Sequence, residues 1–143
     1  MRKRILSGFW ALLMVWSWGC KGEAPTADAA WYRIEAPAVT VRSGERTEAQ
    51  VRFVPLQGYH WNEEFPAKVR LSELQKVLPD RTDFTSGGGD FRAEGGVGVL
   101  PIALSGQTAG SGRMRAVSDF SICNPKECRI FKGVVTELPV EVQ

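Results

Sequence analysis

The sequence predicts an all-β domain, a β-sandwich of seven to nine short strands that follows an N-terminal targeting segment. Two observations support this fold class. Apolar and polar residues alternate over short segments, and glycine (15) and proline (8) interrupt the chain too often for long helices. A chain of 143 residues fits one domain better than two. Hydrophobic residues at 43% and charged residues at 24% exclude a wholly disordered chain.

Residues 1–19 are predicted to be a lipoprotein signal peptide. Basic residues open this segment, and the apolar stretch from Ile5 to Trp18 is shorter than an ordinary membrane span. Gly19 then precedes Cys20, which resembles the processing site of bacterial lipoproteins, where the cysteine becomes the acylated N-terminus. We therefore expect lipidation at Cys20, with ordinary secretion and an uncleaved anchor as the alternatives.

The leader also determines the expected location and the charge of the mature chain. Several acyl chains on Cys20 hold a protein stably on a lipid membrane, and Lys21 favours the outer membrane, facing the periplasm of the cell envelope. An unlipidated chain would be secreted. The three basic residues of the leader more than account for the formal net charge of +2, so no nucleic-acid partner is expected. Residues 20–30 are small and polar, and we expect a flexible linker ahead of a domain at 31–143.

The expected strands follow one another along residues 32–142. Thr47–Pro55 and Arg113–Ile122 alternate as half-buried strands do. Val97–Leu104 is apolar almost throughout, which predicts burial on both faces, with Pro101 at an edge or a bulge. The opening segments form a strand pair or one strand bent at Pro37. The other expected strands are Tyr32–Glu35, Ala38–Arg42, Lys68–Leu71, Arg129–Val135 and Leu138–Val142.

Two segments depart from the strand pattern. Ser72–Leu78 is predicted to form two helical turns that end at Pro79, because its apolar residues share one side at helical spacing. Thr82–Gly96 is rich in glycine and has no apolar period, which predicts a long loop that is either mobile or functional.

The cysteine count predicts one disulfide. Three cysteines are an odd number for an exported protein, and acylation of Cys20 leaves Cys123 and Cys128. Between these two lie Asn124 and Pro125, which favour a tight turn because proline presets φ and asparagine suits the position before it. Such a turn brings its two ends within disulfide range.

Two roles for this disulfide are open. As a structural staple it closes a ring of only about six residues, which corresponds to about 2 kcal/mol, the low end for disulfides. As a redox-active dithiol it would cycle between oxidised and reduced forms, with Lys126 and Arg129 stabilising a thiolate and Glu127 opposing them. The spacing of the pair differs from the CxxC motif of thioredoxin-like enzymes and does not choose between these roles.

Other functional signals are weak. His60 lies among aromatic residues without a GxSxG serine, so a structural histidine is favoured over a catalytic base and no hydrolase is predicted. The acidic residues between Asp80 and Glu94 lack EF-hand spacing, so no metal site is expected. The glycines at 87–89 lack a phosphate-binding lysine motif, so we expect neither a nucleotide site nor a cofactor.

Three segments, in the same order and at similar spacing over residues 58–142, resemble the N-terminal periplasmic domain of the thiol:disulfide interchange protein DsbD. The first is Gly58-Tyr59-His60 followed by the segment 65–71, and the second is Val99–Leu104. The third is Gly112–Val142, where one strand reaches Cys123, a short turn leads to Cys128, and Leu138-Pro139-Val140 closes the domain. Arg129-Ile130-Phe131 stand where that family has prolines.

The resemblance implies an immunoglobulin-like sandwich in which Cys123 and Cys128 pass reducing equivalents to a thioredoxin-like periplasmic partner. It also implies an aromatic cap over the pair, and by chain order Phe84 or Phe91 in the loop at 82–96 would supply the ring. Full-length members of that family carry a membrane electron-transfer domain and a thioredoxin-like domain, and this sequence contains neither. The alternative is therefore a non-enzymatic binding or scaffolding lipoprotein with a permanent disulfide.

Overall fold

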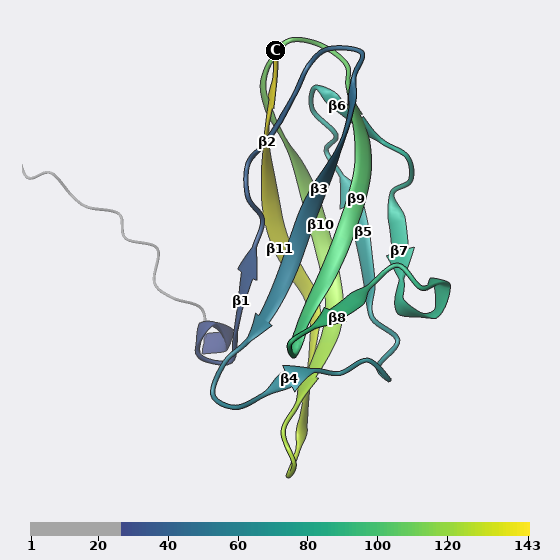
Figure 1. The fold of residues 1–143 in the computed structure, drawn as a ribbon. Helices are drawn as coiled ribbons and strands as arrows, with labels where there is room; N and C mark the ends of the chain where they lie inside the picture. The colour runs from purple at the N-terminus through teal and green to yellow at the C-terminus, as the bar shows by residue number, and fades with distance from the viewer. Residues whose placement is uncertain (1–26) are drawn as a thin grey trace, which may run out of the picture.

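A computed structural model describes residues 27–143 (Figure 1). The signal peptide, Cys20 and most of the linker lie outside the described residues, so the expectations for them stay predictions. Within residues 27–143, none of the helices has both the length and the apolar character needed to cross a membrane.

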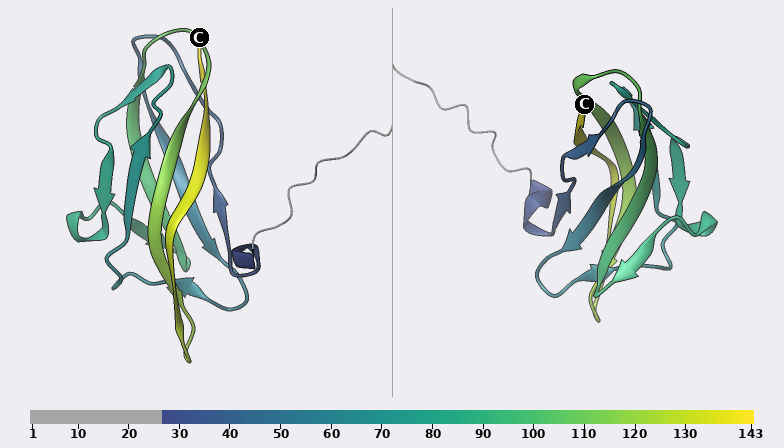
Figure 2. Two further views of the ribbon diagram at one scale, coloured as in Figure 1. Left: turned by 180° about the vertical axis from the view of Figure 1, so that it is seen from behind. Right: turned by 45° about the horizontal axis from the view of Figure 1, so that its top comes forward.

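The described chain folds into two facing sheets, a β-sandwich, which confirms the predicted fold class (Figures 1 and 2). In the first sheet β1, β3, β9 and β6 lie in that order, and β8 also pairs with β9. In the second, β2, β11, β10, β5 and β7 lie in that order, and β4 also pairs with β10. The strands of the first sheet are β1 (Tyr32–Glu35), β3 (Arg46–Pro55), β6 (Val77–Pro79), β8 (Arg92–Glu94) and β9 (Val97–Gly106). Those of the second are β2 (Val39–Val41), β4 (His60–Trp61), β5 (Lys68–Ser72), β7 (Asp83–Thr85), β10 (Gly110–Cys123) and β11 (Cys128–Val142).

The opening segment divides between the two sheets. β1 pairs antiparallel with β3, whereas β2 pairs in parallel with the end of β11. The two segments therefore neither pair with each other nor form one bent strand, and this corrects both readings from the sequence. Pro37 lies between them, where its fixed φ and missing N–H interrupt strand pairing.

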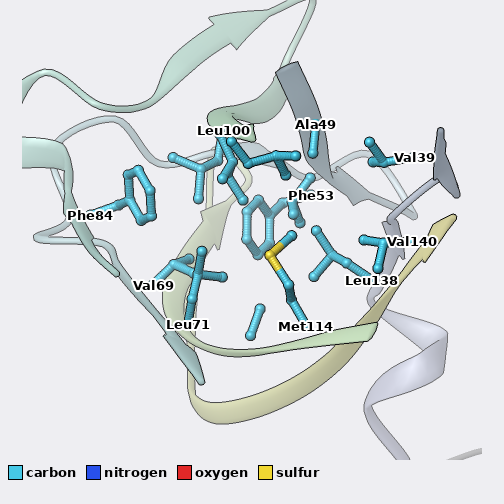
Figure 3. Close-up of a cluster of buried hydrophobic side chains, with 14 of the residues drawn as sticks. Val39, Ala49, Phe53, Val69, Leu71, Phe84, Leu100, Met114, Leu138 and Val140 are labelled. Carbon is cyan, nitrogen blue, oxygen red and sulfur yellow. The ribbon is translucent and has the colours of Figure 1, made fainter. Parts of the chain in front are cut away.

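The core lies between the sheets and follows the strand period of two. Along β3, Ala49, Val51 and Phe53 are buried while their neighbours are not, and β5 buries Val69 and Leu71 in the same way. Phe53 of β3 and Met114 of β10 both belong to this cluster, which Figure 3 shows between the sheets. Burying such side chains is the main favourable contribution to folding, roughly 1.5–3 kcal/mol for each large one.

The predicted helical turns at 72–78 are not formed. Ser72 closes β5, and Val77–Pro79 is β6 in the opposite sheet. Between them the chain turns at Glu73 and Lys76, whose φ angles are +50° and +67°. Val77 and Pro79 are buried while Leu78 is 54% exposed. Burial in this segment therefore follows the two-residue period of a strand rather than the 3.6-residue period of a helix.

The expected long loop at 82–96 contains two short strands. β7 extends the second sheet beside β5, and β8 extends the first beside β9. A short 3-10 helix, η2 (Ser86–Gly88), joins them, with Thr85 accepting a hydrogen bond from the Gly88 N–H as its N-cap. These strands, together with the two-residue β4, raise the number of strands in residues 27–143 above the seven to nine expected.

Two further predictions about strands change. Pro101 lies inside the first sheet rather than at an edge or bulge, with Gln50 as its partner on β3. On its other side β8 pairs only as far as Val99 and β6 only from Leu104, so no neighbouring strand needs the missing N–H. The last two predicted strands are one strand, β11, which carries a bulge opposite Asp119.

Candidate functional site

Cys123 and Cys128 form a disulfide, as predicted, with their Cα atoms 4.0 Å apart. They are the last directly opposed residues of β10 and β11, at the base of the connecting turn. The tip of this hairpin projects at the end of the sandwich where β4 lies, opposite the C-terminus (Figures 1 and 2). The disulfide therefore joins neighbouring strands of one hairpin and does not link the two sheets.

The turn between the cysteines is stabilised by Asn124, as its sequence indicates. The Asn124 side-chain oxygen accepts hydrogen bonds from the backbone N–H groups of Lys126 (2.9 Å) and Glu127 (2.8 Å). The Asn124 N–H donates to the Glu127 carbonyl at 2.9 Å, which leaves Pro125 and Lys126 as the two central residues. Pro125 and Lys126 are exposed at the tip.

The two sulfur-bearing residues differ in exposure. Cys123 is only 8% exposed, whereas Cys128 is exposed to solvent. Both line a hollow of about 380 Å³ beside the hairpin. Its other lining residues are His60, Trp61, Asn62, Glu63, Glu64 and Asn124. An incoming thiol would thus meet Cys128 more readily than Cys123.

Strand β4 and the segment after it make the wall of this hollow. In the β4–β10 register Trp61 lies opposite Ile122, and His60 lies opposite Cys123. The Asn62 N–H donates to the Ser121 carbonyl at 3.0 Å, which holds the following acidic residues beside the hairpin. From the sequence, a structural role for His60 was favoured over that of a catalytic base, and Asn62, Glu63 and Glu64 were not expected at the site. The Gly58-Tyr59-His60 turn was the one signal in this region.

Arg129 anchors the hairpin to the body of the domain. Its guanidinium lies 3.6 Å from the centre of the Trp31 ring, and its Nε donates to the Tyr59 hydroxyl at 3.0 Å. The Tyr59 hydroxyl in turn donates to the Glu127 carboxylate. This hydrogen bond from Tyr59, together with Arg129, lowers the pKa of Glu127. Neighbouring strand residues point to opposite faces, so Arg129 faces away from the side of the hairpin that carries the disulfide.

The two phenylalanines expected as a cap have different surroundings. Phe84 is buried in the core on β7, where the Arg81 guanidinium lies 4.8 Å from its ring centre. Phe91 is half-buried and stacks on Trp61, with ring centres 5.5 Å apart. Among the described residues that line the hollow, Trp61 is the aromatic one, and its side chain is buried in the sandwich, so Phe91 adjoins the site through Trp61. A shielding role for either phenylalanine stays a prediction.

Within residues 27–143, no three His, Cys, Asp or Glu side chains are grouped so as to hold a metal ion. The acidic residues of the segment 80–94 instead form ion pairs, for example Asp80 with Arg46 and Asp90 with Arg81. The disulfide and its hollow are accordingly the candidate site.

Fold and site define the class of the protein as an immunoglobulin-like β-sandwich domain with a disulfide at the tip of one hairpin. No family model matches the chain, and a search of curated proteins finds no match. Among solved structures, domains 4 and 5 of the S-layer protein SbsC align with a TM-score of 0.44 at 13% identity, over 78% of this chain and 50% of that one. A cohesin–dockerin complex from Clostridium thermocellum, Coh-OlpA-Doc918, aligns with a TM-score of 0.43 at 14% identity, over 79% of this chain and 99% of that one. None of these comparisons identifies a DsbD N-terminal domain.

Proposed function

We propose that the domain exchanges thiol and disulfide equivalents with a thioredoxin-like partner through Cys123 and Cys128. The observation that carries the proposal is the position of the disulfide, at a hairpin tip with the exposed Cys128 beside an open hollow. A local ring of this size constrains the unfolded chain little, so stability alone is a weak reason for the bond. The resemblance to the DsbD N-terminal domain supports the same function.

Exchange would begin at Cys128, the more exposed of the two cysteine residues. A partner thiolate attacks Cys128 Sγ and forms a mixed disulfide, and Cys123 leaves as a thiolate. The second partner thiol then attacks the partner sulfur of this mixed disulfide and releases Cys128. The partner dithiol is oxidised by two electrons and the domain disulfide is reduced. The same steps run in reverse when the partner is the oxidant.

The reduction potential of the Cys123–Cys128 couple tests this function. Equilibration with redox buffers and trapping of free thiols should give a value within about −120 to −270 mV, the range of exchange proteins. A value below about −300 mV marks a structural disulfide and contradicts the proposal. That outcome would favour the second candidate function, a binding or scaffolding domain with a permanent disulfide, to which the burial of Cys123 is also suited.

We also propose that Cys20 carries the lipid that holds the domain at the membrane. The proposal is supported by the leader and by the small residue before this cysteine. Mass spectrometry of the mature protein should find an N-terminal acylated Cys20. The Cys20→Ser variant should leave the membrane fraction, and a variant that stays there would contradict lipid anchoring through this residue.

A further inference from the structure

We infer that His60 is the acid–base residue of this disulfide, which protonates the Cys123 thiolate when the bond opens. The inference rests on the proposed exchange function and assigns a role to the only histidine in the chain. Its basis is the strand register. His60 lies directly opposite Cys123 on β10, and Cys123 lies directly opposite Cys128 on β11, so the three residues form one row across three strands.

The three residues also share one face. Trp61 and Ile122, the next opposed pair in the register, are 4% and 0% exposed because they point into the sandwich. Neighbouring residues alternate in direction, so His60 and Cys123 point the other way. Directly opposed side chains of antiparallel strands have Cβ atoms about 4.5–5.5 Å apart, close enough for an imidazole and a thiolate to exchange a proton. Both side chains line the same hollow.

His60 is also accessible to solvent, which can resupply its proton. Glu63 and Glu64, from the segment after β4, are the other titratable side chains that line the hollow. From the turn before β9, Gly96 approaches the histidine and carries no side chain, and a Cβ built there would lie 3.4 Å from the His60 Cβ. From the hairpin, Asn124 and the two cysteines line the hollow.

The chemistry follows from which sulfur leaves. When a partner thiolate attacks Cys128, the electron pair of the broken S–S bond moves to Cys123, which is poorly exposed and would be a buried anion. Thiolates leave faster when they are stabilised as anions. A protonated His60 supplies a positive charge beside that sulfur and then its proton, giving a neutral thiol and a neutral imidazole. In the reverse direction the imidazole removes the proton and restores the attacking thiolate.

Reduction kinetics at two pH values test the inference. Oxidised protein and the His60→Gln variant are mixed with dithiothreitol, and the Cys123 and Cys128 thiols are trapped and quantified by peptide mass spectrometry. The charge of a free histidine side chain changes between about pH 5 and 8. At pH 6 the variant should be reduced about tenfold more slowly, a factor equivalent to about 1.4 kcal/mol, and at pH 9 the two rates should agree within about twofold. The ionisation of dithiothreitol changes with pH in the same way for both proteins, so it cancels in the ratio of their reduction rates at each pH.

Further variants separate a charge effect from a structural one. His60→Lys keeps a positive charge across this range and should restore most of the rate at pH 6. Glu63→Gln and Glu64→Gln should leave the pH dependence of the ratio in place. A His60→Gln rate that falls equally at both pH values, or does not fall, overturns the inference. A reduction potential below about −300 mV would contradict the proposed exchange function. The rates of the natural protein and the His60→Gln variant could still be compared in that case. Failure of the proposed function and failure of the inference about His60 can therefore be told apart.

Discussion

The indole ring of Trp61 lies directly on the backbone of Gly98 across the two sheets. A Cβ atom built at Gly98 would lie 2.3 Å from Cδ2 of the indole, far inside van der Waals contact. The ring has little freedom to move, because it stacks on Phe91 and also packs against Phe53, with ring centres 5.5 Å and 5.3 Å apart. Glycine at position 98 therefore leaves room for the buried ring of a residue that also lines the hollow beside the disulfide.

The Gly98→Ala variant should lose about 2 kcal/mol of unfolding free energy, because an overpacked core forces side chains out of their rotamers. Urea unfolding followed by fluorescence measures this loss. Gly87→Ala is the matched control, since a Cβ at Gly87 meets no atom within 4 Å, and its stability should change by less than about 0.5 kcal/mol. Equal stability of the two variants would show that Trp61 is free to shift.

The network of Arg129 should hold the disulfide hairpin in place. Tyr59→Phe removes the hydroxyl that accepts from Arg129 and donates to Glu127, and this should lower the free energy of unfolding. Amide hydrogen exchange should rise in the hairpin at 120–131 and remain unchanged in β3. Arg33→Lys, at an exposed ion pair with Glu35, is the control and should change neither quantity. Uniform exchange across the domain would contradict a local anchor.

Asp119 makes stability depend on pH through the bulge of β11. Its carboxylate accepts the Gly133 N–H at 2.8 Å and lies 3.3 Å from the Lys68 ammonium, and its side chain is 18% exposed. The Gly133 hydrogen bond, with the charge of Lys68, lowers the pKa of Asp119. A lowered pKa in the folded state means that the unfolded chain binds more protons in acid. The stability that the Asp119 carboxylate contributes is therefore fully present above the pKa of the unfolded chain, near 4. It is lost as the pH falls through the lower pKa of the folded state.

Asp119→Asn should accordingly cost about 1 kcal/mol at pH 7, because a charge-assisted hydrogen bond becomes a neutral one. The difference from the natural protein should shrink as the pH falls below about 4. Urea unfolding between pH 7 and pH 2.5 measures both effects. Glu48→Gln, on the exposed face of β3, serves as the control and should show no such trend. A difference that stays constant across this range would rule out the linkage.

The local features of the site could be predicted from the sequence, whereas its long-range partners could not. Asn124 and Pro125 encode the turn between the cysteines through their own backbone preferences, so the disulfide could be inferred. The pairing of His60 with Cys123 depends on how distant strands align, and no local pattern records that register. The segment at 72–78 fits helical spacing and strand alternation equally well, and sheet pairing decided the outcome.

Phe84 and Phe91 should respond differently to truncation. Phe84→Ala empties a core position and should cost about 3–5 kcal/mol, with little effect on the rate at which dithiothreitol reduces the disulfide. Phe91→Ala removes the ring that stacks on Trp61, so Trp61 should become mobile and reduction should accelerate. Thiol trapping measures the rates under native conditions. Unchanged reduction in Phe91→Ala would remove this residue from any shielding role.

The sandwich should remain folded without its disulfide. The bond closes only a short ring within one hairpin, while the core between the sheets draws on residues from both and excludes the hairpin tip. The chain-entropy estimate for such a ring is about 2 kcal/mol, against about 5–15 kcal/mol of total stability for a typical domain. Cys123→Ser/Cys128→Ser should thus unfold cooperatively in urea, with a lower midpoint and an unchanged slope. A variant that lacks a cooperative transition would show that the fold requires the disulfide. That result would contradict the exchange function, because an exchange protein must stay folded when its disulfide is reduced.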